Sequence, residues 1–118
     1  MARLFVYGSL LSGEHNHHVL GSAVLLGTRE TLPEFELVDL GAYPALVRGG
    51  RTAVRGELYE VDPRALPALD SFEDEGEYVR VEVELTDGST AEAYVFHAGG
   101  IEDRPRVTSG DWRFRSKG

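Results

Sequence analysis

Residues 78–96 of the chain read YVRVEVELTDGSTAEAYVF, two runs in which apolar and polar side chains alternate. A two-residue period is the period of a β-strand, and the Asp87-Gly88 dipeptide between the runs is typical of a tight hairpin turn. The pattern therefore predicts a β-hairpin over 78–85 and 90–96, with the valines and Leu85 facing inward and the charged side chains facing outward.

The segment before the hairpin predicts another strand and a helix. Residues 55–61 read RGELYEV, a strand pattern, and Asp62-Pro63 then supplies an N-cap and a first helical residue. Apolar side chains three residues apart extend a short helix over 63–72. Pro67 removes one backbone hydrogen bond from this helix and favours a kink or a 3₁₀ start.

Shorter patterns precede these elements. Residues 4–7, LFVY, form an apolar run that stops at Gly8, which predicts a buried strand followed by a tight turn. Weaker patterns indicate a helical turn over 15–20 and strands over 23–26, 34–38 and 45–47.

The balance of strands and helices predicts the fold class. Mostly antiparallel strands with one or two short helices indicate an α+β fold, and this many strands in 118 residues favours a small mixed, mainly antiparallel β-barrel with short flanking helices. The length fits one domain over residues 1–118. Residues 100–118 form a C-terminal tail to which the pattern assigns no structure.

The composition excludes several classes of function. The chain has no cysteine, so disulfides, thiolate nucleophiles and cysteine-ligated zinc are excluded. Its formal net charge is −8 and its pI is about 4.9, which disfavours nucleic acid and anionic membranes as partners. The first residues lead into a strand pattern without an apolar leader, so we expect a cytoplasmic location. The oligomeric state stays open.

The first candidate site is the turn Tyr7-Gly8-Ser9-Leu10 at the end of the first strand. Glycine leaves backbone N–H groups unobstructed, and turns of this kind bind carboxylates or oxyanions. The alternative is that Gly8-Ser9 is an ordinary loop. A nucleophilic Ser9 would need a histidine base and an acid, and its flanking residues do not form a G-x-S-x-G motif.

The second candidate is Glu73, which ends the predicted helix beside Phe72 and is followed by Asp74, Glu75 and Glu77. Crowding by like charges and partial burial against the ring both raise a carboxyl pKa, which suits a general base near neutral pH. The alternative is a solvated acidic helix end. If both candidates form one site, a small anion should lie between the amides of residues 8–10 and the carboxylate of Glu73.

Two further clusters have weaker functional interpretations. Residues 14–18 read EHNHH, which invites a metal site at His15, His17 and His18. Adjacent histidines point apart and no third ligand converges, so we expect a surface loop that binds no functional metal. Trp112, which lies among several arginines, is either a stacking platform or part of a C-terminal segment that folds over the domain.

Six sequence blocks in a fixed order resemble the gamma-glutamylcyclotransferase-like superfamily. The blocks are FVYGSL, NH, YPA, RGELYEV, LDSFE and YVR, which begin at Phe5, Asn16, Tyr43, Arg55, Leu69 and Tyr78. The most similar branch is that of the short gamma-glutamylamine cyclotransferases and their bacterial relatives. The resemblance covers residues 3 to about 97, and Gly110-Asp111-Trp112 is also similar to bacterial members.

The resemblance implies a small barrel whose cavity binds a gamma-glutamyl group. It assigns the substrate turn to Tyr7, Gly8, Ser9 and Leu10, the catalytic glutamate to Glu73, and the tyrosine of a Tyr-x-Arg block to Tyr78. The implied reaction closes 5-oxoproline and releases an amine, with Glu73 as general acid and base and without a metal or organic cofactor. The implied partner is a small gamma-glutamyl compound.

The resemblance leaves the identity of the leaving amine open. A lysine side chain, a polyamine, an amino acid and a glutathione-derived peptide all fit the reaction. Two other functions also stay open, namely a non-catalytic small-molecule binding module on the same fold and a related gamma-glutamyl acyl hydrolase or transferase that uses the same pocket.

Overall fold

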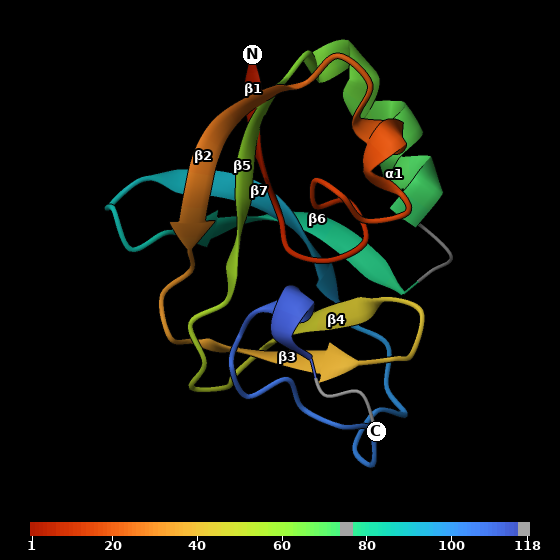
Figure 1. Cartoon of the computed structure of the whole chain (residues 1–118), viewed down its shortest axis with the longest axis vertical. Coiled ribbons are helices and arrows are strands. Elements are labelled where there is room, and N and C mark those ends of the chain that lie inside the picture. Colours follow the sequence, from red (N-terminus) through yellow and green to blue (C-terminus); the bar gives the residue numbers. More distant parts are fainter. Residues whose placement is uncertain (74–76, 116–118) are drawn as a thin grey trace.

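The computed structural model describes residues 1–73 and 77–115, and of Glu73 the backbone alone (Figure 1). Its main layer is a five-stranded sheet in the order β2-β5-β1-β7-β6. The strands are β1 (Ala2–Val6), β2 (Val24–Glu30), β5 (Arg55–Val61), β6 (Tyr78–Glu84) and β7 (Thr90–Phe96). Neighbouring strands are antiparallel except β1 and β7, which pair in parallel at Leu4 and Glu92.

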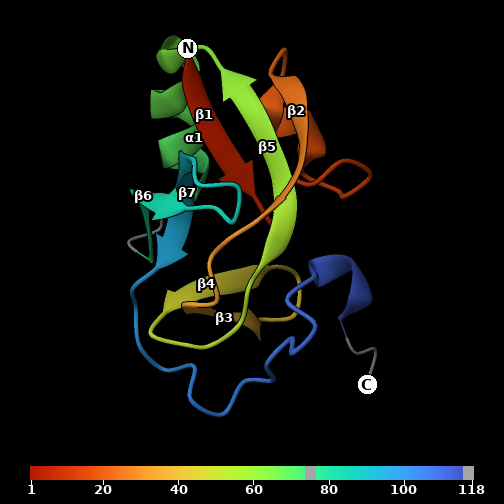
Figure 2. The ribbon, with the colours of Figure 1, turned by 90° about the vertical axis from the view of Figure 1, so that its left-hand side faces the viewer.

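A two-stranded ribbon, β3 (Phe35–Asp39) and β4 (Pro44–Arg48), lies at one end of the main sheet (Figures 1 and 2). The helices are η1 (His17–Leu20), η2 (Pro63–Ala65), α1 (Leu66–Glu73) and η3 (Trp112–Phe114), of which only α1 is α-helical. The weak patterns in the first half of the chain are thus confirmed as η1, β2, β3 and β4. In the described part of the chain, every helix is too short or too polar to cross a membrane.

The middle strand of the sheet is β1, which confirms the predicted buried strand and ends it one residue early. Leu4, Phe5 and Val6 are almost fully buried, and the antiparallel partner of Val6 is Glu57 on β5. Strand β1 has a neighbour on each side, so its end lies inside the sheet. Tyr7 and Leu10 of the turn that follows are consequently buried.

The predicted hairpin is confirmed as β6 and β7, but the assignment of its faces is wrong at one end. Val83 and Leu85 are buried, as expected, whereas 45% of Val79 is exposed. The physical reason is that β6 is an edge strand whose first residues are covered by α1. The covered face there carries Arg80, which binds Asp70 of α1.

The mixed, mainly antiparallel α+β character is confirmed, but the sheet does not close into the predicted β-barrel. Its edge strands β2 and β6 meet only at one end, through a bridge between Thr31 and Leu85 and two adjacent backbone hydrogen bonds. A register shift between Leu25 and Gly27 bends β2, and Leu25 is half exposed. Closure needs continuous pairing of the two edges, and a strand that bulges and faces solvent does not supply it.

The predicted helix is confirmed with the irregular start that Pro67 suggested. The carboxylate of Asp62 accepts a hydrogen bond from the backbone N–H of Arg64 at 2.9 Å, which caps the 3₁₀ turn η2. The chain then continues without a break into α1. The proline therefore lies in the first turn of α1, where its missing N–H costs no hydrogen bond.

The C-terminal segment, for which the sequence predicted no structure, packs on the domain. The backbone N–H of Val107 donates to the carbonyl of Leu37 at 2.7 Å, so this segment runs along β3. Trp112 on η3 is only 1% exposed and belongs to the main hydrophobic core. Burial of this side chain confirms the interpretation of a segment folded over the domain and excludes an exposed stacking platform.

Candidate functional site

A cavity of about 270 Å³ lies where the turn after β1, the end of α1 and the start of β6 come together. All five residues that the sequence predicted to bind substrate line it, namely Tyr7, Gly8, Ser9, Leu10 and Tyr78. The other lining residues are Phe5, Val6, Asn16, Tyr43, Pro44, Phe72, Glu77 and Tyr94. The structure therefore brings the predicted turn, Tyr78 and Phe72 near the end of α1 to one cavity.

The turn is held in place through its carbonyl groups. Leu11 N–H donates to Gly8 O at 3.0 Å, Asn16 N–H donates to Ser9 O at 3.0 Å, and His17 Nδ1 lies 2.8 Å from Leu10 O. Within residues 1–73 and 77–115, the N–H groups of residues 8, 9 and 10 have no protein acceptor. Three successive amides in a fixed turn are a suitable site for a carboxylate or an oxyanion.

Gly8 is required by a close contact. Its φ angle lies outside the left-handed region, so the backbone conformation alone would admit other residues. A β-carbon at this position would overlap the ring of Pro44. The sequence interpretation explained the glycine by its unobstructed N–H groups, whereas the contact that requires it is the approach of residues 43–44 to the turn.

Two tyrosines of the cavity are fixed by hydrogen bonds to the backbone of other elements. The hydroxyl of Tyr7 donates to the carbonyl of Tyr94 at 2.6 Å, and the hydroxyl of Tyr78 donates to the carbonyl of Pro44 at 2.8 Å. The ring of Tyr78 also meets Phe96 edge to face, with centroids 5.3 Å apart. These contacts give the cavity walls a defined shape before any ligand binds.

The C-terminal end of α1 reaches the cavity through Phe72, which is 43% exposed and lines it. Glu73 is the next residue and the last of the helix. Its side chain, together with Asp74 and Glu75, lies outside what the structure describes. The role of Glu73 as a base and the crowding by these two neighbours therefore stay predictions.

The charge of Asp70, one helical turn before Glu73, is compensated. Its carboxylate accepts hydrogen bonds from Arg80 Nε at 2.8 Å, Arg80 Nη2 at 3.1 Å and the hydroxyl of Tyr94 at 2.7 Å. The hydrogen bonds from Arg80 hold the pKa of Asp70 below its usual range, although partial burial acts in the opposite direction. Asp70 thus binds the helix to the hairpin as half of an ion pair.

The histidines after the turn have structural contacts. His17 Nδ1 lies near Leu10 O, as described above, and its ring lies against Tyr59 with centroids 5.8 Å apart. His15 Nε2 lies 3.2 Å from the side-chain nitrogen of Asn16. Among the described residues, no three histidine or carboxylate side chains come close enough to hold a metal ion.

Sequence reasoning missed several residues of the cavity. Tyr94, Tyr43 and Pro44 line it, and Glu77 contributes a carboxylate, but none was proposed as a site residue. The signal for Tyr43 and Pro44 was present, because both belong to one of the six blocks that carry the resemblance. Tyr94 had no such signal, since alternation within the hairpin does not distinguish a cavity wall from the core.

The fold is that of AIG2-like α+β proteins. The structure superposes on the crystal structure of an AIG2-like protein from Mus musculus with a TM-score of 0.77 and 33% sequence identity, over 89% of this chain and 84% of the mouse chain. The profile of the family described as gamma-glutamyl cyclotransferase, AIG2-like, matches residues 4–114. The chain belongs to this family.

Curated relatives agree with this assignment. A Vibrio cholerae protein is 46% identical over 110 residues, which are 92% of this chain and 93% of that protein. A Bos taurus protein named gamma-glutamylaminecyclotransferase is 44% identical over 84 residues, which are 62% of this chain and 49% of the bovine protein.

Proposed function

We propose that this protein is an enzyme that cyclises a gamma-glutamyl amine or peptide to 5-oxoproline and releases the amine. The observation that supports the proposal is a cavity lined by the turn Tyr7-Gly8-Ser9-Leu10, by Tyr78 and by Phe72 near the end of α1. Family membership supports the reaction class. A cavity of about 270 Å³ is near the lower end of the range for small-molecule sites, which suits a short substrate.

The reaction needs little from the protein besides substrate geometry and proton transfer. The α-amine nitrogen of the substrate forms a bond to its own γ-carbonyl carbon, and the bond from that carbon to the leaving nitrogen breaks. Because nucleophile and electrophile belong to one molecule, a correctly folded substrate reaches effective molarities on the order of 10⁵ to 10⁸ M. The cavity walls supply this folded conformation.

The residues of the cavity divide the remaining work. The amides of residues 8–10 bind the α-carboxylate or the oxyanion that develops on the γ-carbonyl oxygen. Glu73 removes a proton from the α-ammonium group, whose ordinary pKa is about 8, and later passes a proton to the departing nitrogen. Tyr78, which is fixed by Pro44, forms part of the substrate-facing wall.

The name of one relative favours an amine over a peptide as the leaving group. The bovine relative is named a gamma-glutamylaminecyclotransferase and is 44% identical to this chain over 84 residues. A panel of gamma-glutamyl compounds with lysine, polyamine, amino-acid and peptide leaving groups tests this choice, with 5-oxoproline release as the measurement. Release from none of them would instead support a binding module without turnover.

A hydrolase that uses the same pocket makes a different product. Hydrolysis would give glutamate, with one oxygen from water in the new carboxyl group, whereas cyclisation gives 5-oxoproline without incorporation of that oxygen. Turnover in ¹⁸O-labelled water followed by mass spectrometry therefore distinguishes the two reactions.

The substitution Glu73→Gln tests the assignment of the base. Gln is nearly isosteric with Glu but cannot accept the proton, and loss of a positioned general base lowers the rate by roughly 10² to 10⁴. We expect this loss in kcat, while the melting temperature and substrate affinity change little. Steady-state kinetics of 5-oxoproline release and a thermal unfolding curve measure these quantities.

Glu77→Gln is the matched control, because Glu77 also lines the cavity and the substitution makes the same chemical change. We expect this variant to keep more than about a tenth of the wild-type kcat. If Glu77→Gln removed activity while Glu73→Gln retained it, the base would be Glu77.

A further inference from the structure

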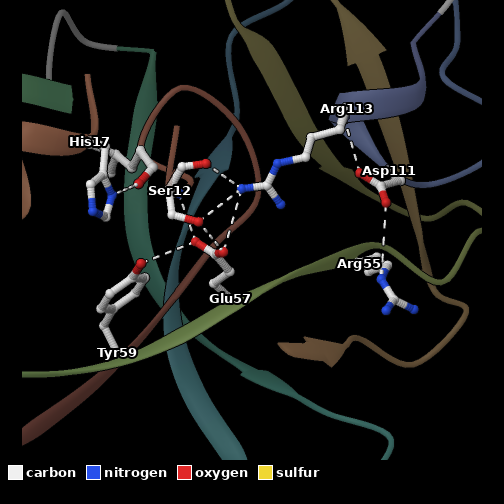
Figure 3. A network of polar contacts seen from close by, with 8 residues as sticks. Ser12, His17, Arg55, Glu57, Tyr59, Asp111 and Arg113 are labelled. Carbon is white, nitrogen blue, oxygen red and sulfur yellow. Dashed lines mark hydrogen bonds and ion pairs between the residues drawn. The ribbon is translucent and has the colours of Figure 1, made fainter. Parts of the chain in front are cut away.

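The carboxylate of Glu57, which does not line the cavity, accepts hydrogen bonds from four donors (Figure 3). The donors are Ser12 N–H at 2.8 Å, Ser12 Oγ at 2.6 Å, the hydroxyl of Tyr59 at 3.1 Å and Arg113 Nη2 at 3.4 Å. Three separate parts of the chain therefore meet at one carboxylate: the end of the turn, β5 and the C-terminal segment.

Glu57 is the most deeply buried charged residue of the described chain, with 7% of its surface exposed. Burial by itself would raise the pKa of this carboxyl group. The hydrogen bonds from Ser12 and Tyr59 and the charge of Arg113 outweigh that effect, so the pKa of Glu57 lies below its usual range. The carboxyl group of Glu57 is an anion at neutral pH, and the contacts from Ser12, Tyr59 and Arg113 all stabilise its charged form.

Arg113 contacts both the carboxylate of Glu57 and Ser12, and so adds a second link between them. Its Nη2 group donates to the carbonyl and, at 3.1 Å, to the hydroxyl of Ser12. Arg113 itself is held by η3, where Asp111 caps the helix by accepting a hydrogen bond from the backbone N–H of Arg113 at 3.0 Å. Ser12 is consequently fixed from two sides.

Ser12 lies two residues after Leu10, the last predicted substrate-binding residue of the turn. Between Gly8 and Ser12 the chain has one internal backbone hydrogen bond, from Leu11 N–H to Gly8 O. Because Leu11 precedes Ser12 directly, a displacement of Ser12 would move this bond and the turn that it closes. The network does not contact the cavity, but it fixes one end of the segment that does.

We propose that Glu57 is a positioning residue, whose carboxylate, shared between Ser12 and Arg113, sets the geometry of the substrate turn and makes the C-terminal segment part of the scaffold of the site. This inference rests on the proposed function for its catalytic consequence. Oxyanion and carboxylate binding depend on donor positions to within a fraction of an ångström, and a displacement of about 1 Å costs up to 10²-fold in rate.

The test uses four substitutions in the whole chain and one matched control. Glu57→Gln weakens every contact of the carboxylate, Ser12→Ala removes the shortest of them, and Arg113→Met removes the guanidinium while it keeps an unbranched chain. Arg113→Lys restores the charge. Arg55→Met is the control, because Arg55 lies in the same neighbourhood but pairs with Asp111 (Figure 3).

Hydrogen exchange of the backbone amides of Leu11, Ser12 and Asn16 reports the turn directly and requires no substrate. In Glu57→Gln and Ser12→Ala we expect these amides to exchange about tenfold faster, while amides of the β6–β7 hairpin keep their wild-type rates. Unchanged exchange of the turn in both variants would overturn the proposal, even if one of them had lower activity.

The kinetic measurement asks whether this geometry matters for turnover. We expect kcat/KM for 5-oxoproline release to fall roughly 10- to 100-fold per folded molecule in Glu57→Gln and Arg113→Met, with partial recovery in Arg113→Lys and none of this loss in Arg55→Met. A loss that only follows the folded fraction, or faster exchange with wild-type kcat/KM, would show a purely structural role and overturn the proposal.

Failure of the proposed function has a different signature. If the wild-type protein releases no 5-oxoproline from any gamma-glutamyl compound, the reaction is wrong, while the exchange measurement still decides whether Glu57 holds the turn.

Discussion

Residue 8 has to be glycine because of the contact between the turn and Pro44, and this makes a specific prediction. In Gly8→Ala the new methyl group overlaps the proline ring, so either the turn or residues 43–44 must move. Overpacking of this kind costs about 1–3 kcal/mol of unfolding free energy. We also expect a higher KM, because both partners line the cavity.

The control for Gly8→Ala is Gly99→Ala. A β-carbon at Gly99 meets no atom within 4 Å, and its φ angle is not in the left-handed region. The unfolding free energy should therefore change by less than about 0.5 kcal/mol in urea denaturation. Equal stability of the two variants would mean that the Pro44 contact is not tight in solution.

The site could be predicted from the sequence only at residues whose type is unusual for their position. Gly8 after a buried strand was recognisable because a glycine interrupts an apolar pattern, whereas the prediction of Glu73 at a helix end lies on a side chain outside the described residues. Tyr94 was invisible because an inward-facing tyrosine on a strand fits the core equally well. Glu57 was also missed, since a strand that carries one glutamate on each face gives no sign of which one is buried.

At the level of elements, the pairing of Asp70 with Arg80 and Tyr94 attaches α1 to the hairpin. Removal of the charge in Asp70→Asn should destabilise the protein by about 1 kcal/mol at neutral pH, a modest amount because the carboxylate is 41% exposed. The exposed Asp103 provides the control, and Asp103→Asn should have little effect on unfolding free energy.

The effect of Asp70→Asn should depend on pH in a defined direction. The folded-state pKa of Asp70 is lowered, so its stabilisation is fully present above the ordinary aspartate pKa of about 3.9 and is lost as pH falls through the folded-state value. The difference in unfolding free energy between wild type and variant should therefore shrink below about pH 4. A difference that stayed constant down to pH 2 would contradict this account.

Local sequence patterns predicted which helices and strands exist. They did not predict features that depend on contacts between elements, namely barrel closure and the exposed face of β6. The bounds of β5 and the hairpin follow from periodicity and turn residues alone. Whether β2 and β6 close a barrel depends on a bulge at Leu25 and on solvent exposure along β2, and neither is visible in a single strand. The exposure of Val79 has the same origin, because an edge strand is defined only by its neighbours.

For the molecule as a whole, the C-terminal segment is part of the core. Trp112→Ala should lower the unfolding free energy by about 3–5 kcal/mol, which is a large share of the 5–15 kcal/mol typical of a domain. Phe114→Ala on the same 3₁₀ helix is the control, because Phe114 is 75% exposed and the change should stay within about 0.5 kcal/mol. Urea denaturation followed by circular dichroism measures both variants. Tryptophan fluorescence cannot be used, because Trp112→Ala removes the only tryptophan.

The parallel pairing of β1 with β7 determines when this protein can acquire its structure during synthesis. Residues 2–6 leave the ribosome early, but one of their two neighbours, residues 90–96, is made only after most of the chain. Until then β1 has one open edge, and the turn that follows it lacks both Tyr94 and Arg113. In the nascent chain, one edge of the apolar strand β1 therefore stays unpaired while residues 90–96 are still missing. We expect the complete fold to form only after the C-terminal segment has left the exit tunnel.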